Sequence, residues 1–430
     1  MIWLYRTITL PFLLLSTPFY LRRMWRRGGY GKDWQQRLGY FPQLPPKEPV
    51  RKRIWIQAVS VGEVLALAPL VERLNELNRF EIVLTTTTST GYREALARFQ
   101  ERVLQVGIFP IDIAPFSKRA WKRIQPDAVI LTESELWPEH IQNAQTSKSP
   151  VFLINARISD ASFKRFQQFS FFSRWIFKHI HAVISSTQQD YERLVALGAS
   201  PLPKIGNLKV DVPLPSLLSE SARKEQLEAL GYKPSNDREP FVLIGASTWD
   251  QEEALLLSIQ KRLIESDLPC FLLLVPRHAE RRNALLKILE QQSLEWDFAT
   301  STDAEKKPTQ IFLSDTTGQL TKLLRLADLA FIGKSMPPNQ GGQTPIEAAG
   351  LGIPTVFGPN MGNFQMIKEQ LLQAGASKEV RSEAALYEFV RAFIEDPSKR
   401  SKMRAAGLKW HQVNQGITDY ICEQITHQVS

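Results

Sequence analysis

The strongest constraint on the fold of this chain is a repeated alternation between short apolar runs and longer helical patterns. From about residue 53 the runs IWIQAVSV, EIVLTTTT and DAVILTES are each followed by a helical pattern, and further strands are expected at residues 150–156 and 181–186. A second series of apolar runs covers residues 240–247, 269–276, 328–333 and 353–359. Nearly continuous apolar strands separated by helices are typical of parallel sheets that are covered on both faces. The sequence therefore predicts an α/β protein with two doubly wound sheets.

The two series of strands also predict the domain organisation. Residues 211–240, which separate them, are rich in proline, serine and charged residues, as in a linker with a short helix. We expect one Rossmann-like domain over residues 28–212 and a second over 213–430, whose last helix is a candidate to pack back on the first domain. The simplest architecture has the two domains facing each other across a cleft, with ligands beyond the carboxyl ends of the strands.

The N-terminus predicts contact with a membrane. Residues 1–21 are mostly apolar, and residues 22–27, RRMWRR, place four arginines directly behind them. This order is the reverse of a secretory signal peptide, and no small-residue cleavage site follows. Roughly twenty residues, at about 1.5 Å each, just cross a hydrocarbon core, whereas Arg6, Pro11 and Pro18 suit a shallow interfacial helix equally well. We expect residues 1–27 to be an anchor whose basic flank faces anionic headgroups.

Charge and cysteine content narrow the class of protein. The chain has 53 Lys and Arg against 44 Asp and Glu, a net charge of +9. Its two cysteines, Cys270 and Cys422, cannot form a disulfide framework or a cysteine-rich zinc site, which favours a reducing compartment. Only His179 and His181 of the six histidines are close together, so no metal site is predicted. The basic residues outside the N-terminus are dispersed, which argues against nucleic acid as a partner.

In the first series, the loops after the strands present carboxylates. We expect Glu63, in VSVGE, to lie at the start of a helix and to point its carboxylate into the expected cleft. Gly62, just before it in the loop, permits a tight turn. Glu63 either complements the helix dipole or serves as a base for an acceptor hydroxyl, which would require a raised pKa. Glu133 and Glu135 follow a later strand, with a helix expected near Trp137, and either bind a substrate or cap that helix. The Thr-rich segment 82–93, IVLTTTTSTGYR, runs from a strand into a turn, and its Thr residues either are ordinary strand sequence or help to bind an anion.

In the second series, the loops present groups suited to phosphate. Arg277 and His278 leave a strand directly, and a guanidinium there fits a phosphate, with a surface salt bridge as the alternative. Residues 341–350, GGQTPIEAAG, give a glycine turn whose amides can approach a phosphate, and Glu347 lies one turn inside the helix that follows. The segment has no P-loop sequence.

Taken in order, these motifs resemble the bacterial 3-deoxy-D-manno-octulosonic acid (Kdo) transferases, which act on a lipid A precursor. The resemblance runs through most of the chain, from the apolar N-terminus with its basic flank onward. It is carried by WIQAVSVGE (55–63), TTTTSTG (85–91), ESELWP (133–138), NARIS (155–159), GNLKVD (206–211), GAST (245–248), VPRH (275–278) and the segment from Phe331 through GPNMGNF (358–364).

The resemblance implies a glycosyltransferase-B fold and an inner-membrane enzyme on the cytoplasmic face. It also implies inverting transfer of Kdo from CMP-Kdo to a tetraacylated lipid A precursor (lipid IVA) in lipopolysaccharide core biosynthesis, without a metal or other cofactor. Family roles carried onto matching positions make Glu63 the general base. The nucleotide contacts implied are Pro276, Arg277, Gly318, Gln319, Leu320, Thr344, Pro345, Ile346 and Glu347.

The departures from the family pattern all fall in the donor half. Trp249, Asp250 and Gln251 follow the AST run where the family usually has a histidine and then an acidic residue or glycine. Gln343 and Thr344 follow a glycine pair where the family usually has His-Asn, Gln319 stands for a usual glutamate, and residues 331–335 read FIGKS where paired glycines are common. A related membrane-associated glycosyltransferase with a different nucleotide sugar, or a non-catalytic relative of the fold, therefore remains an alternative.

Overall fold

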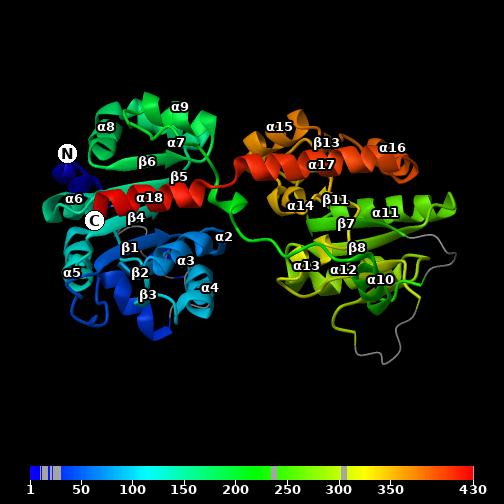
Figure 1. The fold of residues 1–430 in the computed structure, drawn as a ribbon, viewed down its shortest axis with the longest axis horizontal. Coiled ribbons are helices and arrows are strands. Elements are labelled where there is room, and N and C mark those ends of the chain that lie inside the picture. The colour runs from blue at the N-terminus through cyan, green and yellow to red at the C-terminus, as the bar shows by residue number, and fades with distance from the viewer. Residues whose placement is uncertain are drawn as a thin grey trace. The chain divides into compact units, whose positions relative to one another are not determined.

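The computed structural model describes residues 1–9, 11, 18–19, 22, 31–233, 240–301 and 308–429. They form two compact units, Met1–Val212 with Asn414–Ser430, and Pro213–Val413 (Figure 1). Of the predicted basic flank at residues 22–27, residues 23–27 lie outside the described residues, as does much of the predicted apolar anchor. Among the residues that are described, no helix is both long and apolar enough to cross a membrane.

The described residues of the first unit form a six-stranded parallel sheet with the strand order β3-β2-β1-β4-β5-β6. The strands are β1 (Lys52–Ala58), β2 (Phe80–Thr86), β3 (Gln105–Ile108), β4 (Ala128–Thr132), β5 (Val151–Ala156) and β6 (Ala182–Ser185). All but the short edge strand β3 follow the predicted runs. The order reverses between β1 and β4, which is the topological switch point of a doubly wound sheet.

Helices cover both faces of this sheet, as the alternation of side chains along a strand requires. In β1, Ile54 and Ile56 belong to one core cluster, whereas Trp55 between them belongs to the cluster on the opposite face. The helices are α2 (Val61–Ala66), α3 (Ala68–Glu76), α4 (Ser89–Phe99), α5 (Ala114–Ile124), α6 (Pro138–Ser147), α7 (Asp160–Gln168), α8 (Ser170–Lys178), α9 (Gln188–Ala196) and α18 (Ile417–Val429), with short 3-10 helices η1 (Gly31–Leu38) and η2 (Leu208–Val210).

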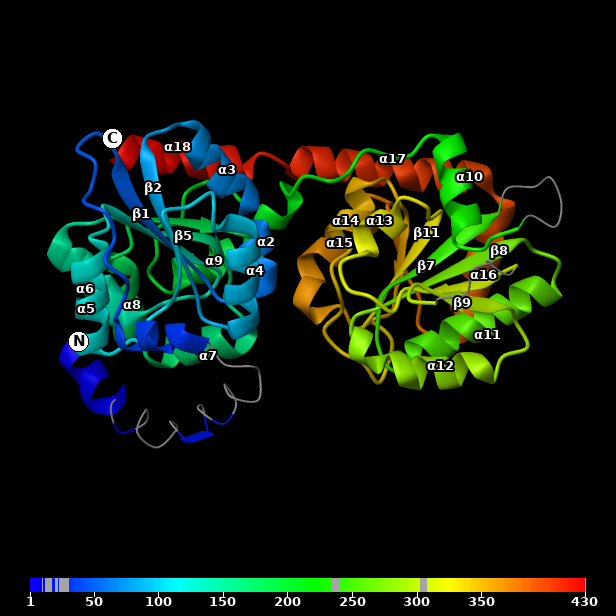
Figure 2. The same cartoon turned by 90° about the horizontal axis from the view of Figure 1, so that it is seen from below.

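The C-terminal helix α18 is part of the first unit. Its Ile421 and Ile425 lie in the same buried cluster as Leu70 of α3, and Figure 2 shows the two helices side by side. The Asp211 carboxylate fixes the start of α18 because it accepts hydrogen bonds from the Gly416 and Thr418 amides at 2.8 and 2.6 Å. The chain therefore returns to its first unit after completing the second.

The described residues of the second unit form a seven-stranded parallel sheet with the order β13-β12-β11-β7-β8-β10-β9. Its strands are β7 (Phe241–Thr248), β8 (Cys270–Pro276), β9 (Trp296–Phe298), β10 (Ile311–Leu313), β11 (Leu329–Ile332), β12 (Thr355–Phe357) and β13 (Ser377–Glu379). The helices are α10 (Glu220–Ala229), α11 (Glu252–Glu265), α12 (Arg282–Glu290), α13 (Leu320–Leu324), α14 (Ile346–Gly350), α15 (Gln365–Gln373), α16 (Glu383–Glu395) and α17 (Pro397–Asn414), with η3 (Ala279–Arg281) and η4 (Gly362–Phe364). The strand order reverses between β7 and β11.

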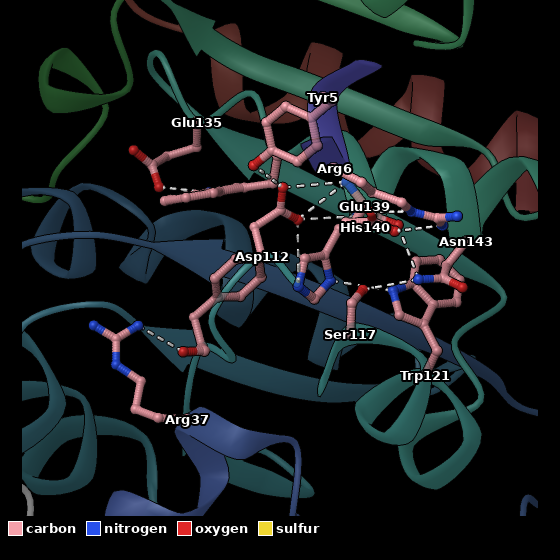
Figure 3. A network of polar contacts seen from close by, with 12 residues as sticks. Tyr5, Arg6, Arg37, Asp112, Ser117, Trp121, Glu135, Glu139, His140 and Asn143 are labelled. Carbon is pink, nitrogen blue, oxygen red and sulfur yellow. Dashed lines mark hydrogen bonds and ion pairs between the residues drawn. The ribbon is translucent and has the colours of Figure 1, made fainter. Parts of the chain in front are cut away.

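The N-terminal residues 2–9 are helical and are tied to the first unit by polar contacts. Figure 3 shows Tyr5 donating a hydrogen bond to Asp112 at 2.8 Å and Arg6 making two bonds to Glu139 at 2.6 and 3.0 Å. Asp112 also accepts bonds from the Glu139 and His140 amides, so it caps the N-terminus of α6. This network joins the N-terminal helix to the helix that follows Glu133 and Glu135.

Candidate active site

The switch point of the first sheet carries three of the carboxylates singled out in the sequence. Glu63 follows β1, and Glu133 and Glu135 follow β4, the strand paired with β1. The carboxyl ends of two adjacent parallel strands meet at one edge of the sheet, where loops are free to bind ligands. Residues from two parts of the chain that are 70 positions apart are therefore brought together by topology.

The Glu63 side chain is buried, with 8% of its surface exposed, in the first turn of α2. Its Oε2 accepts hydrogen bonds from the Val59 amide at 2.8 Å and the Thr132 hydroxyl at 2.7 Å. The Ser60 hydroxyl donates to Oε1 at 3.1 Å. These donors fix the orientation of the carboxylate but include no cation, so its charge is not neutralised by an ion pair.

The surroundings of Glu63 favour holding a proton. Burial is the largest cause that raises its pKa, and the charge of Glu133 raises it further, against the hydrogen bonds from Val59, Thr132 and Ser60. The Thr132 hydroxyl also lies 3.0 Å from the Gln57 carbonyl oxygen. Since a hydroxyl has one proton, Thr132 can donate to Glu63 when the latter is ionised, or to Gln57 while it accepts from protonated Glu63. Both protonation states are thus accommodated.

Glu135 is a second proton-holding group in the same cluster. Its carboxylate accepts a bond from the Trp137 indole at 2.8 Å, and burial, followed by the charges of Glu63 and Glu133, raises its pKa from 4.5 to about 7. Glu133 lies in the left-handed backbone region at φ 52°, and its carboxylate is 3.7 Å from the Lys209 ammonium. Trp137 immediately precedes α6, as the sequence predicted, so neither Glu133 nor Glu135 caps that helix.

The Thr-rich segment positions the Glu63 loop. Thr88 caps α4, and its hydroxyl lies 2.8 Å from the Val59 carbonyl oxygen, while the Thr87 hydroxyl accepts a bond from Gln57. A Cβ on Gly91 would lie 2.9 Å from the Thr88 hydroxyl oxygen, so glycine permits the close approach. These hydroxyls bond protein groups, which does not support the anion-binding interpretation of the segment.

Gly62 does not have the function that the sequence suggested. It lies within α2, it is absent from the residues with positive φ, and a Cβ there would meet only the Ser60 hydroxyl, at 4.0 Å. A tight turn is therefore not the reason for glycine at this position. Its effect is to leave the exposed surface beside Glu63 open.

In the second unit, Arg277 and Glu347 lie at the same edge of the sheet. Pro276 ends β8, and Arg277 follows it with an exposed side chain. Burial raises the pKa of Glu347, while the Thr321 hydroxyl, 3.5 Å away, and the charge of Arg277 lower it. Three loops are thus close enough to contact one ligand. They are the loop that begins with Arg277 after β8 and the loops that lead into α13 and α14.

The remaining predicted nucleotide contacts are placed on two helix starts. Gly318, at φ 80°, is exposed and precedes Gln319, which occupies the N-cap position of α13, and Leu320, the first residue of that helix. The residues Thr344, Pro345, Ile346 and Glu347 form the start of α14, where the Thr344 hydroxyl accepts a bond from the Ile346 amide. The structure therefore gathers the predicted donor residues on neighbouring loops of one unit.

The glycine turn before α14 has a packing requirement. Gly341 and Gly342 have φ of 101° and 69°, in the region that favours glycine. A Cβ on Gly342 would lie 2.4 Å from the Met361 sulfur, and one on Gly341 would lie 2.6 Å from the Asn363 amide nitrogen. Glycine at both positions therefore lets the turn pack closely against the segment GPNMGNF.

Three residues at the switch point of the second sheet were not predicted as a group. Trp249 follows β7, Lys334 follows β11, and the Glu252 carboxylate accepts a backbone hydrogen bond from each of them, at 3.0 and 2.7 Å. Glu252 also accepts bonds from the Ser335 and Met336 amides. The departures at Trp249 and in residues 331–335 were the only sequence signal of this arrangement.

Comparisons with known proteins identify the family. Residues 32–212 match the family model described as 3-deoxy-D-manno-octulosonic-acid transferase (kdotransferase). A 3-deoxy-D-manno-octulosonic acid transferase of Haemophilus influenzae is 30% identical over 410 residues, covering 94% of this chain and 91% of that protein. The chain belongs to the Kdo transferase family. The resemblance found in the sequence is thereby confirmed, and membership makes the protein a glycosyltransferase.

Two further comparisons support the family and the fold. A Kdo transferase of Rickettsia bellii is 29% identical over 422 residues, which cover 97% of each chain. The solved structure of UDP-GlcNAc 2-epimerase from Neisseria meningitidis bound to UDP-GlcNAc matches with a TM-score of 0.58 at 14% identity, over 87% of this chain and 100% of that one. This second likeness concerns the fold alone, which is GT-B-like in having two parallel-sheet α/β domains.

Proposed function

We propose that this Kdo transferase relative moves Kdo from CMP-Kdo to a tetraacylated lipid A precursor, with inversion at the anomeric carbon. The observation that carries the proposal is a buried Glu63, without a cationic partner among its hydrogen-bond donors, at the switch point of the first sheet. Family membership supports Kdo as the transferred sugar, and the buried carboxylate supports base catalysis of the transfer.

In the proposed reaction, the Glu63 carboxylate removes the proton from an acceptor hydroxyl. The acceptor oxygen forms a bond to the anomeric carbon of Kdo, the bond from that carbon to the phosphate oxygen breaks, and CMP leaves with the bonding electrons. A raised pKa makes Glu63 a stronger base than an ordinary glutamate. We propose that the acceptor hydroxyl approaches Glu63 across the open space at Gly62.

The donor is proposed to bind the second unit through the residues carried over from the family. The exposed Arg277 guanidinium supplies positive charge for the phosphate. Glu347, held by Thr321 and near Arg277, offers a carboxylate to ribose hydroxyls. The backbone amides at the starts of α13 and α14 are further donors for the nucleotide. We propose that the transfer needs no metal or other cofactor, because positively charged side chains of the protein contact the phosphate in place of a metal ion.

We further propose that the enzyme works on the cytoplasmic face of the inner membrane, which it contacts through its N-terminal segment. Trp3, Ile8 and Phe19 have 73%, 64% and 73% of their surfaces exposed, an arrangement that suits insertion into an interface. Co-sedimentation with anionic vesicles tests this. Replacing these three residues by serine should release the protein, whereas Val413→Ser, at an equally exposed position in the second unit, should not. Equal retention of both variants would contradict the proposal.

The reaction itself is tested with purified full-length protein, CMP-Kdo generated in situ and the tetraacylated lipid A precursor. Mass spectrometry of the lipid should show an added Kdo residue with the wild-type protein. Transfer from a different nucleotide sugar, with no Kdo added, would contradict the proposed donor and favour the alternative motivated by Trp249 and Gln343. Failure to transfer any sugar, with the fold intact, would favour a non-catalytic relative.

A further inference from the structure

Lys334 has an unusual backbone conformation for its residue type. It follows β11 with φ of 58°, in the left-handed region that favours glycine. Its amide donates to Glu252 at 2.7 Å, and its carbonyl oxygen accepts a bond from the Gly342 amide at 2.9 Å. The backbone is therefore held from both sides, and one of these contacts comes from the glycine turn before α14.

The Lys334 side chain lies over an aromatic ring. Its ammonium nitrogen is 4.3 Å from the centroid of Trp249, and the Trp249 ring meets the His278 ring edge to face at 5.0 Å. A cation on the face of an indole is attracted by the ring while its N–H donors on the other side stay available. The stack spans the switch point between β7 and β11 and extends to the loop that follows β8.

The charge of Lys334 is not matched by a protein carboxylate. Nearby Arg281 pairs with Glu253 at 2.8 Å, and Lys368 pairs with Glu379. In the described part of the chain, by contrast, no carboxylate oxygen lies within 4.0 Å of the Lys334 ammonium, whose one recorded partner is the Trp249 ring. A half-buried cation that is oriented but unpaired, at the ligand-binding edge of a doubly wound sheet, is suited to an anionic ligand.

We propose that Lys334, stacked on Trp249, is a donor-binding residue that contacts an anionic group of the nucleotide sugar, either the phosphate or the carboxylate of Kdo. The proposal rests on the proposed function for the identity of the donor. It also gives a physical account of the two departures at residues 249 and 334. The indole cannot carry the charge that an imidazole can, and the lysine that follows the neighbouring strand supplies a cation above it.

The test compares Lys334→Met with wild-type protein in calorimetric titrations with cytidine and CMP, and in steady-state assays with CMP-Kdo. If Lys334 contacts the phosphate, the Kd for CMP should rise about tenfold or more while the Kd for cytidine stays unchanged. If it contacts the sugar carboxylate, both titrations should be unchanged and the KM for CMP-Kdo should rise by a similar factor. Lys334→Arg, which keeps the charge and the stacking, should restore most of the loss.

Lys334→Gly guards against a folding artefact, because glycine favours the backbone conformation at this position. It should be at least as stable as the wild type and should bind the anionic ligand as weakly as Lys334→Met. Wild-type affinity for CMP and wild-type KM in both variants would overturn the proposal. So would equal weakening of cytidine and CMP, since that would indicate a role in packing Trp249.

The failure of the proposed function is distinguishable from the failure of this inference. Wild-type protein that binds UMP but not CMP would refute CMP-Kdo as the donor, and the same comparison with UMP and uridine would then decide the role of Lys334. Wild-type protein that binds no nucleotide would refute both.

Discussion

The two sheets place opposite chemistry at the same topological position. In the first unit the strands that flank the switch point, β1 and β4, are followed by the carboxylates of Glu63, Glu133 and Glu135. In the second unit the corresponding strands, β7 and β11, are followed by Trp249 and Lys334. The carboxylates of the first unit favour binding protons, whereas Lys334 in the second unit presents a positive charge. The comparison teaches that the same topological position in two similar sheets can carry opposite charge, as the proposed separation of the base from the binding of an anionic donor requires.

The two sheet edges also differ in the hydrogen bonds that hold their buried glutamates. One backbone amide, from Val59, and the hydroxyls of Ser60 and Thr132 orient Glu63. The Glu252 carboxylate, with 1% of its surface exposed, instead uses all of its capacity on four backbone amides. One buried carboxylate is thus held by one amide and two hydroxyls, and the other by backbone amides alone.

The largest effect that this comparison predicts is on catalysis in the first unit. Glu63→Gln should lower kcat by about a thousandfold, as expected for loss of a general base, while the Kd for CMP stays near the wild-type value. Rates of Kdo addition and calorimetric titration with CMP check the two parts. Glu101→Gln, an exposed position in the same unit, should leave both unchanged. Substantial activity in Glu63→Gln would exclude Glu63 as the base.

The next effect concerns the clamp in the second unit. Glu252→Gln should lower the free energy of unfolding by about 2 to 4 kcal/mol. The backbone N–H groups now share two charged carboxylate oxygens, whereas a glutamine side chain would offer them a single neutral oxygen. The substitution should also weaken CMP binding, since the loops after β7 and β11 lose their common partner. Urea denaturation and titration with CMP measure these changes.

Glu265→Gln, exposed at the other end of α11, is the matched control. Unchanged stability in Glu252→Gln would show that the four backbone bonds contribute little, and the contrast between the two buried carboxylates would then disappear.

Much of the sheet architecture was predictable because long strands carry a strong apolar signal. β1, β2, β4, β7 and β8 are each at least five residues long and buried on both faces. β9, β10 and β13 have three residues each, too few to show a period, and only pairing with a neighbour makes them strands. Glu63 was identified as a candidate because its loop could be located from the strand before it.

The contacts that give the sites their chemistry were not predictable, because they join distant parts of the chain. Thr132 bonds Glu63 across 69 positions, and Glu252 bonds the amides of Lys334 through Met336 across 82 to 84. No local pattern reports such pairs. The left-handed conformation of Lys334 was equally hidden, since nothing adjacent in sequence requires it.

A smaller effect is a pH dependence of stability that belongs to the acidic edge. The pKa of Glu135 is raised from 4.5 to about 7, so the folded protein binds more protons than the unfolded chain in this interval. Its contribution to stability is complete below pH 4.5 and is lost as the pH rises through about 7. Glu135→Gln should therefore be more stable than wild type at pH 8 by about 2 kcal/mol, and should show no such gain at pH 4.

Urea midpoints at the two pH values measure this difference, and Glu101→Gln again serves as the control. An equal effect of Glu135→Gln at both pH values would mean that the carboxyl group does not titrate abnormally, which would weaken the description of this edge as proton-holding.

The smallest effect compares a glycine at each edge. Gly62→Ala should raise the free energy of unfolding by about 0.5 to 1 kcal/mol, because the Cβ enters open space within a helix. Gly333→Ala should instead lower it, since its Cβ would lie 2.2 Å from the Ser247 carbonyl oxygen. Thermal unfolding and Kdo addition are measured for both. If Gly62→Ala is more stable yet slower with the lipid acceptor, the space beside Glu63 is used by the acceptor. Full activity would mean that the hydroxyl reaches Glu63 from another side.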